Sequence, residues 1–123
     1  MKFICLGYFD EEVLDSMSLV KASAFVAESL AYHHKLGDHI TNTEVMQSPS
    51  DGKSVRNIDG KIEITEGSSL VMEKVLVTII TLEAEDIDHA TELMSKHPGI
   101  KRSATFEIRR VDDLTELAKG IGK

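Results

Sequence analysis

Residues 73–84 read EKVLVTIITLEA, and the fold is decided by this stretch. Its β-branched content and its short length predict a β-strand. Side chains alternate between the two faces of a strand. We therefore expect Val75, Val77 and Ile79 on one face and Leu76, Ile80 and Leu82 on the other. A strand that is apolar on both faces needs cover on both faces.

The elements that precede this strand are a strand, a helix and a second strand. Residues 2–9, KFICLGYF, predict a strand with the same two-faced pattern, Phe3 and Cys5 against Ile4 and Leu6. After a polar connection, a helix is expected to begin at the N-cap Ser18 and to end near Gly37. Its apolar stripe is Leu19, Ala22, Val26, Leu30 and His33. Residues 39–47 predict the second strand.

A β-hairpin separates this second strand from the strand at 73–84. Two β-rich runs, SVRNI at 54–58 and KIEIT at 61–65, flank Asp59-Gly60. This pair suits a type I′ turn, in which both central residues have positive φ.

A helix and a strand follow the central strand. Asp86 is the expected N-cap of the helix, and Pro98-Gly99 ends it. Its buried stripe is Ile87, Ala90, Leu93 and Met94. Residues 103–111 predict a last strand, and residues 112–123 predict a C-terminal helical extension that belongs to the same domain.

The order β-α-β-hairpin-β-α-β predicts a ferredoxin-like α+β domain with an inserted hairpin. Two helices cover only one face of such a sheet, but its central strands are apolar on both faces. A second copy of the sheet is the simplest cover for the other face. We therefore expect a homodimer that is packed sheet to sheet.

Composition restricts the partners. The net charge of −7 argues against nucleic acid, whose phosphates require a basic surface. No apolar run approaches the length of a membrane span, and the first residues do not resemble a secretory signal. The single cysteine, Cys5, lies in an apolar run and is expected to be a small buried hydrophobe. These features predict a cytoplasmic protein that does not bind membranes.

Several stretches, in this order, resemble the YCII-related proteins, in particular the branch named for an Asp-Gly-Pro-Phe motif. They are KFICLGYFDEE, TEVMQSPS, RNIDGKIEITEG, LEAEDIDHATELMSKHPG and FEIRRV, within residues 1–111. The resemblance implies a dimeric α/β-barrel type of ferredoxin-like fold. It also implies that the protein could be a small-molecule enzyme, although the activity of the family is largely unassigned.

The signature motif of that branch is eroded in this chain, which reads EGSSLVMEK at 66–74. Glu66 and Gly67 keep the acid and the turn, whereas Ser68 and Ser69 replace the proline and the phenylalanine. Glu73 and Lys74 keep both charges in reversed order.

The five histidines are candidate metal ligands and acid/base groups. His33, His34 and His39 lie close in sequence, but helical phase separates the first two and Gly37 separates them from His39. No pair of ligands has zinc-site spacing, so neither a metal nor a cofactor is expected. For His97, two interpretations stay open. It could be a cationic cap at a helix C-terminus, or it could line a pocket, as the resemblance implies.

Glu44 on the second strand and Arg109 on the last strand match positions of the family. They could form a structural ion pair or a substrate clamp with a general base. Both interpretations predict that the two residues are spatial neighbours.

Three functions follow from the sequence. The first is a small-molecule protein with a pocket between helix and sheet, lined by His97, Glu44 and Arg109 and, if catalytic, using cofactor-free acid/base chemistry. The second is a non-enzymatic regulatory module with a degenerate family site. The third is a protein-interaction module that works through its acidic surface and C-terminal helix.

Overall fold

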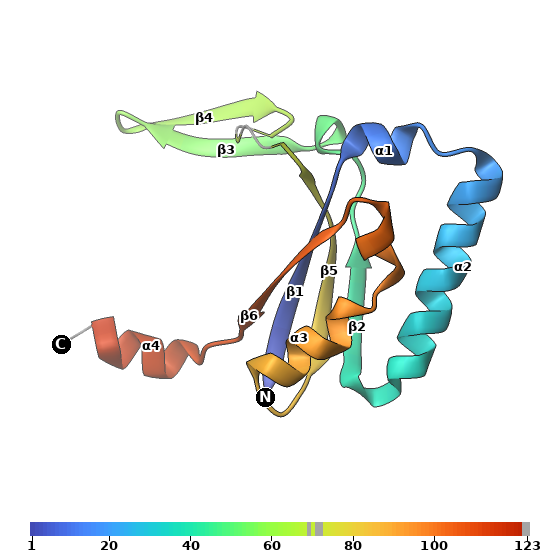
Figure 1. The fold of residues 1–123 in the computed structure, drawn as a ribbon. Coiled ribbons are helices and arrows are strands. Elements are labelled where there is room, and N and C mark those ends of the chain that lie inside the picture. The colour runs from blue at the N-terminus through green and yellow to red at the C-terminus, as the bar shows by residue number, and fades with distance from the viewer. Residues whose placement is uncertain (69, 71–72, 122–123) are drawn as a thin grey trace.

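The computed structural model describes residues 1–68, 70 and 73–121 and contains an antiparallel sheet in the order β2-β5-β1-β6. Its strands are β1 (Lys2–Phe9), β2 (Ile40–Val45), β5 (Val75–Glu83) and β6 (Thr105–Arg110). This strand order confirms the predicted ferredoxin-like α+β fold (Figure 1). The two strands that the sequence makes apolar on both faces, β1 and β5, are the central pair.

One face of the sheet is covered by α2 (Leu19–Leu36) and α3 (Ile87–Ser95) (Figure 1). The core on this face consists of residues that are at most 7% exposed: Phe3, Cys5, Ile80, Leu82, Ala84, Ala90 and Met94. The predicted cap Asp86 accepts a hydrogen bond from the backbone of His89 at 2.8 Å. Of the predicted stripe on α3, Ala90 and Met94 are buried, but Ile87 is exposed.

Among the described residues, no helix covers the opposite face of the sheet, where the half-buried side chains Ile4, Leu6, Tyr8 and Ile79 lie. On β1 these residues alternate with Phe3, Cys5 and Phe9, which are buried beneath the helices. The two-faced pattern predicted for β1 is therefore confirmed. On β5 a register shift opposite Gly7 and Tyr8 places Leu76 beside Tyr8 on the uncovered face and Val75 beside Phe9 beneath the helices, so the predicted sides of Leu76 and Val75 are wrong. We call the uncovered face of the sheet the open face.

The buried side of α2 differs from the predicted stripe. Ser18 caps the helix through the backbone N–H of Lys21, and Gly37 ends it with φ of 56°, as expected. However, Leu19, Val26 and Leu30 are 83%, 58% and 64% exposed. The side chains turned to the body are Ala22, Phe25, Ser29, Tyr32, His33 and Leu36. Aromatic contacts set this rotation, because the Phe25 ring packs on Phe9 with centroids 5.9 Å apart.

A short helix, α1 (Glu11–Asp15), occupies the stretch expected to be a polar connection. Asp10 caps it by accepting from the backbone N–H of Glu12 at 3.0 Å, and two acids in its first turn favour the positive helix end. Three 3₁₀ turns complete the body: η1 (Gly37–His39), η2 (Pro49–Asp51) and η3 (Pro98–Arg102).

The hairpin strands β3 (Lys53–Ile58) and β4 (Lys61–Glu66) form a separate sheet. Asp59 and Gly60 have φ of 51° and 83°, which confirms the predicted turn. The hairpin extends away from α2, on the side of the open face (Figure 1). Its apolar side chains Val55, Ile62 and Ile64 are each more than 60% exposed.

The C-terminal helix α4 (Leu114–Ile121) also extends away from α2 (Figure 1). It begins after Asp113, which accepts hydrogen bonds from the backbone N–H groups of Thr115 and Glu116. Leu114 and Leu117 are 80% and 44% exposed. Across the described residues, no helix is both long and apolar enough to cross a membrane.

Candidate functional site

A cavity of about 410 Å³ lies between α2, the sheet and the start of η3. Its lining is mostly apolar and aromatic, with a few hydroxyls and two histidines: Phe9, Phe25, Val26, Ser29, Leu30, His33, Thr43, Val45, Val77, Thr78, Ile80 and His97. Its volume and its lining are typical of small-molecule sites. Val26, Leu30 and Val45 are each more than half exposed, so the cavity opens to solvent between α2 and the edge strand β2.

Two histidines meet in this cavity, although they are 64 residues apart in the sequence. The Nε2 atoms of His33 and His97 are 3.1 Å apart, which is a hydrogen-bond distance. His97 is 4% exposed and His33 is half-buried. The His97 ring also lies 4.7 Å from the Phe106 ring and 5.8 Å from the Tyr32 ring, measured between centroids. We call His33 and His97 the histidine pair.

Backbone hydrogen bonding fixes the tautomers of the pair. The backbone N–H of Gly99 donates to Nδ1 of His97 at 2.9 Å, so Nδ1 is unprotonated. Neutral His97 therefore carries its proton on Nε2 and donates to His33. His33 must accept at Nε2, and its own proton is on Nδ1. If His33 were protonated at Nε2, both Nε2 atoms would carry a hydrogen and neither could accept, so the hydrogen bond between the two rings would be lost.

Both members of the pair are held neutral near pH 7. Burial and, secondarily, the neighbouring His33 lower the pKa of His97 from 6.5 to about 4. Burial also lowers the pKa of His33. A neutral imidazole can accept a proton, which is what a general base requires.

Local sequence positions His97. Helix α3 ends at Ser95 with Lys96 as its cap, and His97 caps the following turn, η3, with Pro98 as the first residue. The interpretation of His97 as a helix C-cap is therefore wrong, since its ring nitrogens bond to the Gly99 N–H and to His33 and not to the last carbonyls of α3. The alternative, that His97 lines a pocket, agrees with the cavity.

Glu44 and Arg109 are not neighbours, which corrects the prediction that they form a pair within one chain. Glu44 lies on β2 and Arg109 on β6, at opposite edges of the sheet with β5 and β1 between them. Three strand spacings correspond to about 14 Å. Glu44 pairs with Ile79 and Arg109 pairs with Ile4, so both lie on the open face, away from the histidine pair.

The four residues of the family-motif loop also lie outside the cavity lining. Glu66 forms an exposed ion pair with Lys53 at 3.5 Å, and Gly67 turns the chain with φ of 74°. Lys74 donates to the Ser103 carbonyl and to the Thr105 hydroxyl, and Glu73 is exposed. Ser69, Val71 and Met72 in this loop are outside the described residues.

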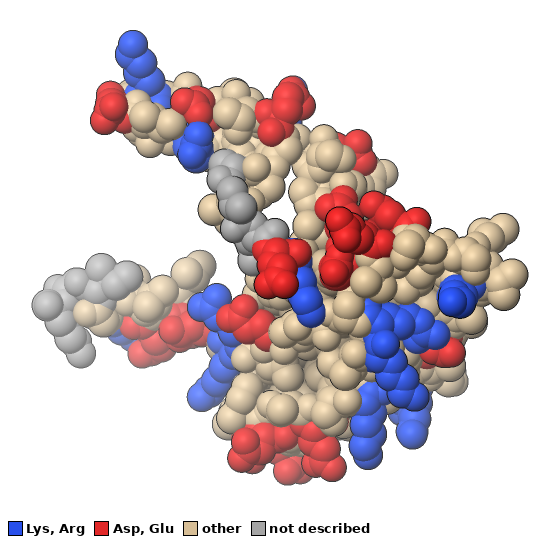
Figure 2. All heavy atoms as spheres, turned by 45° about the horizontal axis from the view of Figure 1, so that its top comes forward, with Lys and Arg blue, Asp and Glu red and all other residues tan. Residues whose placement is uncertain are grey.

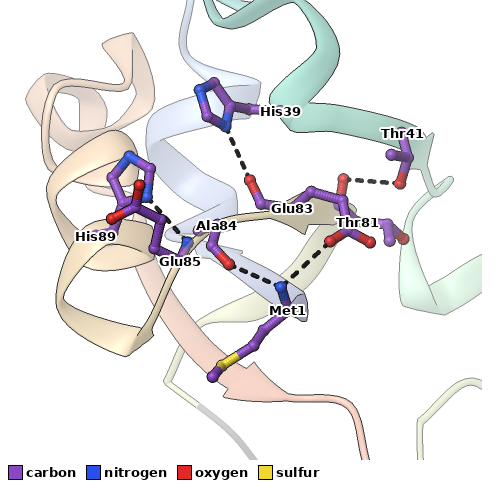
Figure 3. Close-up of polar contacts among 8 residues, drawn as sticks. All are labelled: Met1, His39, Thr41, Thr81, Glu83, Ala84, Glu85 and His89. Carbon is purple, nitrogen blue, oxygen red and sulfur yellow. Dashed lines mark hydrogen bonds and ion pairs between the residues drawn. The ribbon is translucent and has the colours of Figure 1, made fainter.

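Two further histidines pair at the opposite end of the sheet (Figure 3). The His39 and His89 rings are 5.4 Å apart in a T-shaped arrangement. His39 Nδ1 donates to the Glu83 carbonyl, and His89 Nδ1 accepts from the backbone of Glu85. The amino group of Met1 donates to the Ala84 carbonyl nearby. These bonds hold the N-terminus and the β5–α3 connection in place, so we assign His39 and His89 a structural role.

Within residues 1–68, 70 and 73–121, no group of three or more His, Cys, Asp or Glu side chains is placed to hold a metal ion. Cys5 is fully buried, as expected, and burial raises the pKa of its thiol to about 11. Sequence analysis missed the contribution of His33 to the site. The available signal was the i, i+4, i+8 spacing of Phe25, Ser29 and His33, which places them on one helix face.

Fold and cavity together define the class: a ferredoxin-like α+β chain with two histidines in a cavity beneath its long helix. A solved structure similar to this chain is that of 5-chloro-2-hydroxyhydroquinone dehydrochlorinase (TftG) from Burkholderia phenoliruptrix AC1100, in complex with 2,5-dihydroxybenzoquinone. The TM-score is 0.57 at 16% sequence identity, over 94% of this chain and 98% of TftG. This likeness is one of fold.

No family model matches the sequence, and the search of curated proteins found no match. The YCII-related family and its Asp-Gly-Pro-Phe branch therefore stay predictions.

Proposed function

We propose that this chain binds a small, largely apolar molecule in the α2 cavity and acts on it by cofactor-free acid/base chemistry. The observation that carries the proposal is the histidine pair, two neutral imidazoles whose Nε2 atoms meet in an apolar cavity. Convergent ionisable groups with burial-shifted pKa values are typical of catalytic sites.

The fixed tautomers give the two histidines different roles. A substrate oxygen replaces His33 as the acceptor of the His97 N–H, which breaks the bond between the two histidines, and Nε2 of His33 is then free to take a neighbouring acidic proton of the substrate. His97 remains neutral in this step because its Nδ1 stays bonded to Gly99. The developing negative charge on the substrate oxygen is stabilised by the His97 N–H.

The exposed apolar rim supports the binding part of the proposal. Val26, Leu30 and Val45 are apolar, line the mouth and are more than half exposed. A bound apolar molecule would remove part of this surface from water, which is favourable by about 25 cal/mol per Å². The dihydroxybenzoquinone in the TftG complex makes oxygen-bearing six-membered rings the first ligands to test.

Two serines on α2 provide a matched test of binding. Ser29 lines the cavity and Ser23 is exposed outside it. Ser29→Leu should fill part of the cavity and weaken binding of 2,5-dihydroxybenzoquinone at least about tenfold, whereas Ser23→Leu should leave it unchanged. Equal affinity of both variants, measured by calorimetry, would refute binding in this cavity.

Catalysis is tested by His33→Gln, which keeps a polar side chain but removes the base. We expect ligand affinity to stay within about threefold and turnover to fall about a hundredfold or more. If every hydroxyquinone tested binds without being altered, the binding proposal stands alone and the enzymatic part is lost.

We also propose that the chain forms a homodimer through the open face. No helix in the described part of the chain covers its half-buried apolar side chains, and the hairpin and α4 flank it (Figure 1). Glu44 and Arg109 lie at opposite edges of this face, so a two-fold axis parallel to the strands would bring Glu44 of one copy toward Arg109 of the other.

The dimer is tested by light scattering on two Leu→Glu variants. Leu6→Glu puts a charge on the open face, and Leu19→Glu puts the same charge on an exposed position of α2. We expect the mass of two chains for the wild-type protein and for Leu19→Glu, and the mass of one chain for Leu6→Glu. A wild-type mass of one chain at micromolar concentration would refute the dimer.

A protein-interaction role is the alternative function. The observation that favours it is the exposed apolar surface of α4 and of the hairpin, including Leu114, Val55 and Ile62. If these residues are buried in a dimer, their exposure no longer supports a second protein partner. Protection of the α4 backbone amides from hydrogen exchange in the dimer would show that burial.

A further inference from the structure

A second hollow lies on the side of α2 that faces away from the histidine pair. It is a groove of about 780 Å³ bordered by the start of α2, the end of α1, and η3. Its lining residues are Val13, Ser16, Met17, Lys21, Ala24, Glu28, Lys96, Pro98, Lys101 and Arg102, and none of them lines the cavity. We call it the basic groove.

Positive charge is concentrated in the basic groove, although the chain as a whole carries −7. Four cations, Lys21, Lys96, Lys101 and Arg102, face a single carboxylate, Glu28. Figure 2 shows Lys and Arg side chains gathered on the side where α2 lies, apart from the clusters of Asp and Glu. A cleft lined by one sign of charge concentrates field lines and attracts ions of the opposite sign.

The one carboxylate neutralises only one of the four cations. Glu28 Oε2 accepts from Nη1 of Arg102 at 2.8 Å. Lys21, Lys96 and Lys101 are exposed and form no ion pair with any described residue. The field of the groove is also felt by Glu28, since the bond to Arg102 and the charges of Arg102 and Lys101 lower its pKa.

Arg102 is held in a fixed orientation. Its guanidinium lies 4.8 Å from the centre of the Phe25 ring, and its Nη1 also donates to the Pro98 carbonyl. Both hydrogen bonds come from Nη1, so Nε and Nη2 make none within the described part of the chain. An oriented guanidinium with free donors is suited to a phosphate or carboxylate group.

We propose that the basic groove is a second ligand site, for a small phosphorylated molecule. Arg102 and the three lysines would hold the phosphate oxygens, and Val13, Met17, Ala24 and Pro98 would contact the organic part. Lys21 lies in the first turn of α2, a turn without acidic residues, so the positive end of that helix adds to the attraction. The site is separate from the cavity and does not depend on the function proposed there.

Inorganic pyrophosphate is the probe, added at low ionic strength to ¹⁵N-labelled full-length protein. We expect amide shifts in residues 16–28 and 96–102, with affinity that falls as salt rises. Lys21→Gln, Lys96→Gln and Lys101→Gln combined should weaken binding about tenfold or more. All three side chains are exposed, so the variant should fold, and circular dichroism checks this.

The matched control combines Lys53→Gln, Lys61→Gln and Lys119→Gln, which removes the same charge at exposed positions on the hairpin and α4. We expect its affinity to stay within about twofold of wild type. The proposal is overturned if both variants lose affinity equally, if no shifts appear up to about 10 mM pyrophosphate, or if a polyglutamate peptide binds more tightly than pyrophosphate.

Discussion

Replacing His97 by Asn should change how the stability of the protein depends on pH. Asn can keep the hydrogen bond from the backbone of Gly99 through its side-chain oxygen, as an N-cap residue does. It removes the titrating ring and the bond to His33. The substitution therefore separates the protonation of residue 97 from its role in starting η3.

The expected magnitude comes from the pKa of His97. The folded state lowers it from 6.5 to about 4, and each unit corresponds to about 1.4 kcal/mol. Below pH 6.5 the unfolded chain takes up a proton that the folded chain rejects, so stability is lost as the pH falls. The loss attributable to His97 reaches about 3 kcal/mol near pH 4 and is absent above pH 7.

Urea unfolding at a series of pH values between 4 and 7 measures this loss. The matched control is His34→Asn, the same substitution at an exposed position one residue from His33. Wild type and His34→Asn should lose stability in parallel, and the free-energy gap between wild type and His97→Asn should narrow by about 3 kcal/mol on acidification. If the free energy of unfolding of all three proteins falls equally between pH 7 and pH 4, the argument that the buried neutral His97 causes the loss of stability in acid is refuted.

Three further outcomes are expected. The Cys5 thiol, fully buried with its pKa raised to about 11, should react with a thiol reagent only after unfolding; rapid reaction of the native protein would contradict its burial. Gly7→Ala should destabilise the protein by about 1–3 kcal/mol in urea unfolding, because the added Cβ would lie 2.5 Å from Thr78 and 2.8 Å from Phe106. Gly60→Ala has no such neighbours, so it should cost only about 1 kcal/mol for its φ of 83°, and a larger loss would mean that the hairpin packs on another surface.

Local chemistry made much of the fold predictable. The type I′ turn at Asp59-Gly60 and the helix caps Ser18 and Asp86 are confirmed because each depends on neighbours in sequence. The short helix after Asp10 was missed, although the same kind of cap begins it. Its five residues are too few for a periodic apolar pattern to be visible.

The candidate site was only partly predictable. The sequence predicts that His97 could line a pocket, but its partner His33 lies 64 residues away, and no local pattern links them. Glu44 and Arg109 were expected to be close because both lie on strands of one sheet. The strand order β2-β5-β1-β6 places them at opposite edges of the sheet. That order cannot be read from the separation of the two residues along the chain.

The strands, the helices other than α1 and the two apolar faces of β1 could be predicted from the sequence, since period, caps and turn residues act over a few positions. Tertiary structure decided which side of α2 is buried, where the cavity lies, and which histidines meet. The rotation of α2 follows from the packing of Phe25 against Phe9, and the neutrality of His97 follows from burial beneath that helix. Both effects depend on contacts between residues far apart in the chain, which exist only once the sheet and helices have assembled.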